Sequence, residues 1–482
     1  MSYMHRISTS EQATALTVPV TSDASLRVVV GTAPVNLAED PTAVVNVPVL
    51  ANSYKEAVSQ LGFSEDFASY SLCEMMYYSF QVYSVAPIIF INVLDPTKHK
   101  KSYANTAVAV VKSVATIEET GLMLDTLVVK SGSKTLAKDT DYVAAFNDDG
   151  YVEITLLASG SGASATSLDV SADQLDPSKV TKKDIIGGYD SATGKDTGIE
   201  AIRSVYPKLG MVPGLLLAPG WTTDAEVAAA LIGKTEDLNG LFTCEALIDM
   251  DTTTAKKYTD LKTAKETMGV QNEHAIMLWP KIKFDSRVYN YSTVWTTMAA
   301  QCDGDHGDVP YKSPSNETLY ASAAVLEDGT EVLLDIPQAE VVNSYGIVTA
   351  MNDNGWKSYG NNTSIYPSST DPKDRWIACR RMMSWYRNHF ILTFKSKVDE
   401  PASYRLIESI VDSENIYLNS LKATGSIAGG SISFNESDNP VTEIMDGHIK
   451  FTTSVGFWTP AEWIEDEITF DPNLVSAALG GE

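Results

Sequence analysis

The chain has 482 residues, of which 44% are hydrophobic and 20% are charged. This composition is globular, with enough apolar residues for large cores, and the length corresponds to about three domains. Acidic residues outnumber basic ones by 62 to 36, and the net charge of −26 argues against direct binding to nucleic acid. No apolar run approaches the ~18 residues of a membrane span, and the N-terminus lacks the pattern of a secretory signal. We therefore expect neither membrane insertion nor secretion.

The cysteines are few and widely separated. Cys73, Cys244, Cys302 and Cys379 show no CxxC spacing, and structural zinc sites need paired ligands. In a chain of this length, such cysteines are typical of reduced, buried thiols in a protein made in a cytosol.

The N-terminal part begins with a polar segment, 1–25, which we interpret as an arm. Its one strand-like piece, Leu16 to Val20, contains Pro19, which limits it to an edge strand or an extended segment. A strand, two helices and a second strand are then predicted at 26–30, 53–62, 71–82 and 87–94. This order is typical of the start of an α/β layer.

The composition changes at about Tyr103, where short strands replace the α/β pattern. Strands are predicted at 108–114, 127–129, 142–146 and 151–157, and Asp148-Asp149-Gly150 indicates a hairpin turn between the last two. We interpret 103–183 as a small, mostly β domain inserted into the α/β domain.

The alternation of helices and strands resumes after Ile185. Thr223 and Glu226 match a capping box at the start of one helix. The last strands of this part are predicted at 331–336 and 341–350. Such alternation favours a largely parallel sheet covered on both faces, so 26–102 and 184–365 form one discontinuous α/β domain.

The C-terminal part, 366–460, is predicted to be an α+β domain, with helices at 374–388 and 401–421 and a strand at 390–394. Its first helix carries a basic cluster in an otherwise acidic protein: Arg375, Arg380, Arg381 and Arg387. The cluster fits either a solvated face with ion pairs to Asp371 and Asp374, or an electrostatic contact with an acidic partner surface.

Two strand-like segments end the chain. Residues 449–457 alternate apolar and polar side chains, as a strand with one buried face does. Pro460 interrupts the pattern, and in the acidic segment that follows, Ile464, Ile468 and Phe470 share one parity. No hairpin turn folds this segment back, so we interpret 461–482 as an arm that pairs with a neighbour.

Motifs for catalysis are weak throughout. None of the six histidines lies in a protease-like context, no GxSxG elbow is present, and Ser322 is the only serine worth considering. Asp303, Asp305, His306 and Asp308 crowd together, but they lack the spacing of a calcium loop and its closing glutamate, which favours a solvated loop after a helix. We therefore expect no enzyme, no cofactor and no metal, with a subtilisin-like hydrolase as the alternative.

Several short motifs, taken in order, resemble those of contractile phage tail sheath proteins. They include Gly31-Thr-Ala-Pro34, Ile185-Ile-Gly-Gly-Tyr-Asp190, Ser313-Pro-Ser-Asn316, NSYGIVT at 343–349 and Pro460-Ala-Glu462. Their order and spacing carry the resemblance from about Leu26 to Phe470, and 103–183 match least. A receptor-binding tail protein is a further alternative, but the β-repeats that it predicts are not found in the sequence.

The resemblance implies a subtilisin-like central fold without a catalytic triad. It implies subunits in hexameric rings, stacked helically around an inner tail tube, with baseplate and tail terminator proteins as further partners. The sheath would contract and drive the tube through the target cell envelope. Its place would be the virion tail or a phage-tail-like particle, assembled in the bacterial host cytoplasm.

The resemblance also assigns roles to particular residues. Arms from both termini would add strands to neighbouring subunits, and the residues predicted to do so are Leu16, Val18, Val20, Ile464, Ile468 and Phe470. The basic cluster lies in the domain that faces the tube in this family, which would make Arg375, Arg380, Arg381 and Arg387 tube-facing.

Overall fold

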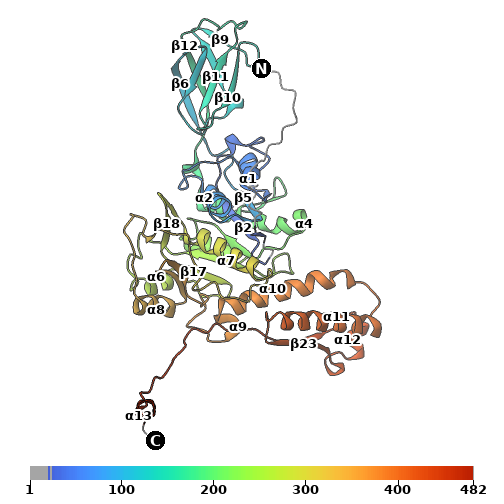
Figure 1. The fold of residues 1–482 in the computed structure, drawn as a ribbon. Coiled ribbons are helices and arrows are strands. Elements are labelled where there is room, and N and C mark those ends of the chain that lie inside the picture. The colour runs from blue at the N-terminus through green and yellow to red at the C-terminus, as the bar shows by residue number, and fades with distance from the viewer. Residues whose placement is uncertain (1–19, 22–23, 481–482) are drawn as a thin grey trace, which may run out of the picture.

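The structure, a computed structural model, describes residues 20–21 and 24–480. Figure 1 shows a central α/β body, from which a β-sandwich projects at one end and the C-terminal end of the chain departs at the other. The mixed α/β class predicted from the sequence is confirmed.

The centre is an eight-stranded sheet with the order β22-β21-β17-β16-β15-β2-β5-β3. The inner strands are parallel, whereas the edge strands β3 and β22 run antiparallel to their neighbours. The inner strands are almost entirely buried, as expected of a parallel sheet covered on both faces. The strands are β2 (Arg27–Gly31), β3 (Pro48–Ala51), β5 (Ile88–Asn92), β15 (Leu215–Leu217), β16 (Glu245–Asp249), β17 (Ala275–Leu278), β21 (Ile347–Asn352) and β22 (Trp356–Tyr359).

Helices pack against this sheet, and α7 (Tyr291–Asp305) is buried along most of its length. The other helices of the body are α1 (Tyr54–Leu61), α2 (Ser71–Tyr77), α3 (Lys182–Ile186), α4 (Val205–Leu209), α5 (Ala225–Ile232), α6 (Leu261–Met268) and α8 (Ile336–Ser344). Small sheets on its periphery contain β1 (Val20–Thr21), β4 (Val85–Ala86), β13 (Gly188–Asp190), β14 (Lys195–Thr197), β18 (Lys281–Phe284), β19 (Arg287–Tyr289) and β20 (Ala323–Val325).

Local hydrogen bonds correct two of the sequence predictions. Asp335 caps α8 in a capping box with Gln338, so 341–344 belong to a helix and β21 begins only at Ile347. Asp224, and not Thr223, caps α5 by accepting the Glu226 N–H. Short apolar runs fit a helix or a strand equally well, which is why the pattern at 341–350 was misleading.

The β-sandwich has its own core, separate from that of the central body. One sheet contains β6 (Lys100–Ala109), β12 (Ser167–Leu175), β8 (Val128–Ser131) and β9 (Lys134–Thr135). The other contains β10 (Tyr142–Phe146), β11 (Val152–Leu156) and β7 (Val114–Ile117). Strand β12 was not among the predicted strands, although its side chains alternate: Leu168, Val170 and Ala172 point into the core, and the residues between them are less buried.

The C-terminal part contains α9 (Pro372–Arg375), the long helices α10 (Ile377–Phe394) and α11 (Tyr404–Ala423), the short α12 (Val441–Met445), and the hairpin of β23 (Gly429–Phe434) and β24 (Phe451–Gly456). Met382 and Tyr386 of α10 share a small core with Leu418 and Leu421 of α11. The strand predicted at 390–394 is wrong, because α10 continues through it. Phe390 and Phe394 instead lie one turn apart, with ring centroids separated by 4.9 Å.

All four cysteines are free and buried, as predicted. None of the helices within the described residues combines the length and the apolarity that crossing a membrane requires.

Candidate assembly surfaces and side-chain clusters

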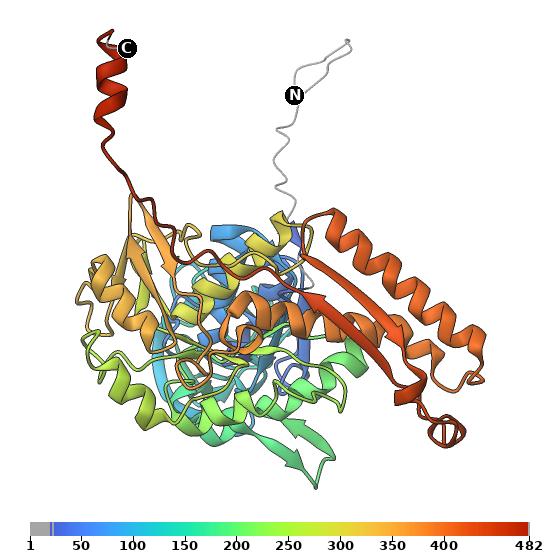
Figure 2. The same ribbon diagram turned by 90° about the horizontal axis from the view of Figure 1, so that it is seen from below.

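The C-terminal segment leaves the body of the molecule (Figure 2). Residues 457–471 form neither helix nor strand, α13 (Pro472–Ala478) follows, and every residue from 461 to 480 is exposed. Ile464, Ile468 and Phe470 are 85%, 87% and 78% exposed. Burying such side chains in a neighbour would remove a large apolar area from water, and the described part of their own chain does not provide that burial.

Four contacts hold the start of this segment, one of them from the Cys379 thiol to the Trp458 carbonyl at 3.5 Å. The Trp458 indole donates to the Gly425 carbonyl at 2.9 Å. The Glu462 carboxylate accepts from the Asn361 side chain at 3.2 Å and lies 3.6 Å from the Arg375 guanidinium. The segment is therefore attached as far as Glu462 and unsupported after it.

Among the residues that the structure describes, the β23–β24 hairpin has one edge without a strand partner. Both backbone groups of Ile432 are bonded to the Asn415 side chain at 3.0 Å, so α11 covers the outer edge of β23 at this point. Ile432 therefore forms a non-hydrogen-bonded pair with its partner Thr453, because the backbone groups of such a pair point away from each other. By the same alternation, the backbone groups of Phe451, Thr453 and Val455 point out from the open edge of β24.

Three N-terminal residues were predicted to add a strand to a neighbour. Two of them, Leu16 and Val18, fall outside the residues that the structure describes. Val20 belongs to β1, which pairs in parallel with Val85–Ala86 of the same chain. One edge of this strand is therefore paired within its own subunit, and the pairing of Val20 with a neighbour stays a prediction.

The basic cluster does not form one exposed surface. Arg381 is buried, and its guanidinium pairs with the buried carboxylate of Asp303 at the end of α7. Arg380 is also buried and lies 3.2 Å from Asp374, one of the two local partners considered from the sequence. The tube-facing role is therefore wrong for Arg380 and Arg381, because this face of α10 packs against the body.

The other two arginines are more accessible. Arg375 lies over the rings of Tyr366 and Trp376, at 4.4 Å and 3.9 Å from their centroids, which adds cation–π attraction to its contact with Glu462. Arg387 is exposed. Of the cluster, Arg387 is the residue that is open to a partner surface.

Ser322, the serine considered from the sequence, has no catalytic partner among the described residues. Ser322 is exposed, and its hydroxyl donates to the Lys283 carbonyl at 3.1 Å. The structure instead brings Ser292, at the start of α7, to 2.5 Å from the buried Asp249, a pair that no sequence signal indicated. Within the described residues, no histidine hydrogen-bonds to either serine, so the general base of a triad is missing there.

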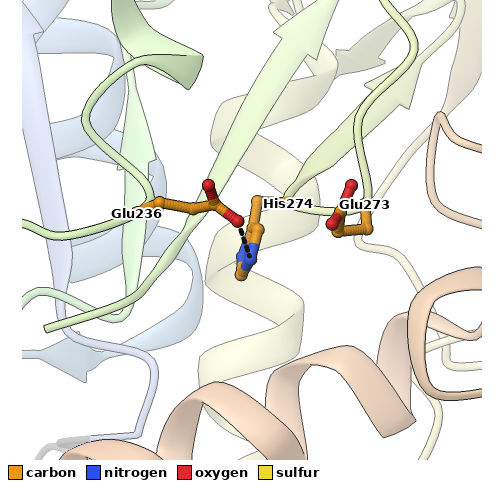
Figure 3. A group of neighbouring side chains, drawn as sticks. All are labelled: Glu236, Glu273 and His274. Atoms are coloured by element: carbon orange, nitrogen blue, oxygen red, sulfur yellow. Dashed lines mark ion pairs between the residues drawn. The ribbon is translucent and has the colours of Figure 1, made fainter.

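A further cluster contains Glu236, Glu273 and His274, whose possible ligand atoms lie within 4.8 Å of one another. Figure 3 shows the His274 ring with the Glu236 carboxylate directed at it. His274 Nε2 lies 3.3 Å from Glu236, and Nδ1 lies 3.6 Å from Glu245. The dipeptide Glu273-His274 before a predicted strand was the one available sequence signal, since Glu236 lies far along the chain. The crowded carboxylates at 303–308 do not form such a cluster within the described residues, because α7 runs to Asp305 and Asp303 is engaged with Arg381.

The chain is similar in sequence to tail sheath proteins of bacteriophages. No protein-family model matches the chain. The tail sheath protein of Burkholderia phage BcepMu is 27% identical over 491 aligned residues, covering 99% of this chain and 98% of that protein. The tail sheath protein of Escherichia phage P2 is 26% identical and covers 56% of this chain and 66% of that protein.

Solved structures show the same fold. A chain of the anti-feeding prophage baseplate superposes with a TM-score of 0.60 at 14% identity, covering 98% of this chain and all of that one. The sheath of the PVC extracellular contractile injection system in its contracted state has a TM-score of 0.56 at 14% identity, with 98% and 99% covered.

Proposed function

We propose that this chain, a contractile tail sheath protein as its relatives confirm, is the subunit that polymerises around an inner tail tube and contracts. The observation that carries the proposal is the similarity to a tail sheath protein over nearly the whole of both chains. The relatives are structural proteins of tails, in agreement with a structural and non-enzymatic role.

The exposed C-terminal segment is the proposed link between subunits. Its extended backbone and its apolar side chains, Ile464, Ile468 and Phe470, suit the addition of a strand to a sheet in a neighbour. The acceptor that fits is the open edge of β24, because the other edge of the hairpin is covered by Asn415. A two-stranded hairpin is only marginally stable alone, so a third strand would also stabilise the acceptor.

Such a contact joins different surfaces of two copies. Head-to-tail contacts of this kind propagate into rings or helical tubes. Hexameric rings stacked around a tube are the arrangement that we infer, with baseplate and tail terminator proteins at the ends and Arg387 as the residue of the basic cluster directed at the tube. The particle would be a virion tail or a tail-like particle, assembled in the host cytoplasm.

The central body is the proposed counterpart of a subtilisin-like domain, built from 26–102 and 184–365. Two features support this assignment: the parallel sheet, and the buried helix α7, whose first turn contains Ser292 bonded to Asp249. Residues 103–183 would be an inserted domain, 366–460 the sheath core domain, and 1–25 and 461–482 the arms. Contraction of the sheath would release free energy stored during assembly. Each subunit would move as a rigid body while its arms stay paired with the neighbouring subunits.

Deletion of residues 464–482 tests the proposal. The truncated protein should remain a folded monomer and form no tubes, while the full chain forms hollow tubes visible by negative-stain microscopy. Ordered tubes from the truncated protein would refute the role of the C-terminal segment.

A further inference from the structure

We propose that His274, Glu236 and Glu273 bind a divalent transition-metal ion such as Zn²⁺. Glu236 lies in the loop between α5 and β16, whereas Glu273 and His274 immediately precede β17. The side chains therefore meet at the amino-terminal ends of two neighbouring strands. The site is independent of the proposed sheath function.

The surroundings of His274 carry the argument. The ring is almost completely buried between two carboxylates, with Glu236 at 3.3 Å from Nε2 and Glu245 at 3.6 Å from Nδ1. A neutral imidazole has a single N–H and can donate to only one of them. In either neutral tautomer the other ring nitrogen directs its lone pair at a carboxylate oxygen, unless a proton or a metal ion lies between them. A metal ion on Nε2 removes that repulsion and leaves the proton on Nδ1.

Glu245 is placed to hold the orientation of the His274 ring, with its carboxylate 3.6 Å from Nδ1, just beyond hydrogen-bond distance. Metal-binding histidines usually donate their second N–H to a carboxylate, which fixes the orientation of the ring. Glu245 is buried, and its carboxylate accepts from the Ser384 hydroxyl of α10 at 2.6 Å.

The two carboxylate ligands, Glu236 and Glu273, have room to move toward an ion bound at His274. Ligand atoms about 2 Å from a zinc ion lie within about 4 Å of one another, so the cluster must contract slightly from its present spread. Glu236 is exposed and Glu273 is partly exposed, which leaves both carboxylates free to rotate. One imidazole with two carboxylates suits zinc and similar metals, whereas Ca²⁺ and Mg²⁺ prefer oxygen ligands alone.

Calorimetric titration of the metal-free full chain with ZnCl₂ tests the site. At pH 7.5 we expect one binding site per chain, little response to Mg²⁺ or Ca²⁺, and a higher melting temperature with Zn²⁺. Glu236→Gln and Glu273→Gln should each weaken binding by at least about tenfold, since even outer-shell changes alter metal affinity by about 10–100-fold.

Glu266→Gln is the matched control, since Glu266 is exposed on α6 and lies outside the cluster. It should bind Zn²⁺ as the wild type does. Absence of binding by the wild type would overturn the proposal. Equal affinities for wild type, Glu236→Gln and Glu273→Gln would overturn it too, because they would mean that Zn²⁺ binds elsewhere on an acidic surface. Both substitutions affect accessible side chains, so loss of the fold is not expected to obscure the result.

Discussion

Arg381 and Asp303 form an ion pair in which both side chains are almost fully buried, at 2% and 1% exposure. Asp303 lies near the end of α7 in the central body, and Arg381 lies on α10 in the C-terminal part. Ser25 joins the pair, since its hydroxyl donates to Asp303 at 2.5 Å and accepts from Arg381 at 2.7 Å. The pair therefore holds α10 against the body next to Ser25, which lies just before the first residue of β2.

Arg381→Ala should strongly destabilise the protein. Removing one partner of a buried ion pair leaves the other charge uncompensated, which typically costs about 3–5 kcal/mol. Urea-induced unfolding of the monomer, followed by tryptophan fluorescence, measures the free energy of unfolding. Arg387→Ala is the control on the same helix, and because Arg387 is exposed its effect should stay within about 0.5 kcal/mol. Similar losses for the two variants would contradict the structural role of the pair.

The contrast between these two arginines illustrates what the sequence could predict. Buried parallel strands such as 87–94 were predicted because their apolar runs are continuous and β-branched. Spacing along α10 could show that several arginines share a helix, but not that Asp303, 78 residues earlier, would lie beside Arg381. The pairing depends on how two distant helices pack, and this is not encoded in any local pattern.

Other groups of residues also differ in whether a local sequence pattern could reveal them. Ile464, Ile468 and Phe470 were recognised because parity within one segment is a local property. His274, Glu236 and Glu245 come together only because the strands β16 and β17 are neighbours in the sheet. At 390–394 and 341–350 the local signal itself was ambiguous, and the capping contact of Asp335 with Gln338 decided the second case.

Glu74 should make stability depend on pH. It is buried on α2, and its carboxylate accepts from the Asn290 backbone and side chain at 2.6 Å and 2.7 Å. Burial raises its pKa from 4.5 to about 7. Between these values the native state holds a proton that the unfolded state has lost. The free energy of unfolding should therefore fall as the pH rises from about 4.5 to 7, by up to about 3 kcal/mol, and then level off.

Glu74→Gln isolates this contribution, because the amide does not titrate and has nearly the same shape. Relative to this variant, the wild type should be more stable at pH 5 than at pH 8. Other carboxylates also titrate in this range, so the quantity to compare is the difference between the two proteins at each pH. Glu266→Gln, at an exposed position, should leave the wild-type pH dependence unchanged. An identical dependence for Glu74→Gln would disprove the assignment.

The apolar side chains of the C-terminal segment should matter for assembly and not for folding. Replacing Ile464, Ile468 and Phe470 together by serine should change the free energy of unfolding of the monomer by less than about 0.5 kcal/mol, since surface substitutions rarely do more. Sedimentation should show that tube formation is lost. Val111→Ser is the control, because Val111 is 67% exposed on the β-sandwich and should be dispensable for tubes. Normal tubes from the triple variant would remove these residues from the interface.

Thr453→Pro tests which edge accepts the neighbouring strand. The Thr453 N–H points out from the open edge of β24, so proline at this position removes a donor that the hairpin itself does not use. We expect a folded monomer, with unchanged far-UV circular dichroism, that fails to form tubes. Thr453→Ala also removes the hydroxyl but keeps the N–H, and it should form tubes normally. The Thr452 N–H, in contrast, points toward β23. Thr452→Pro should therefore disrupt the hairpin itself and lower the stability of the monomer. Tubes formed equally well by Thr453→Pro and Thr453→Ala would exclude this edge of β24 as the acceptor.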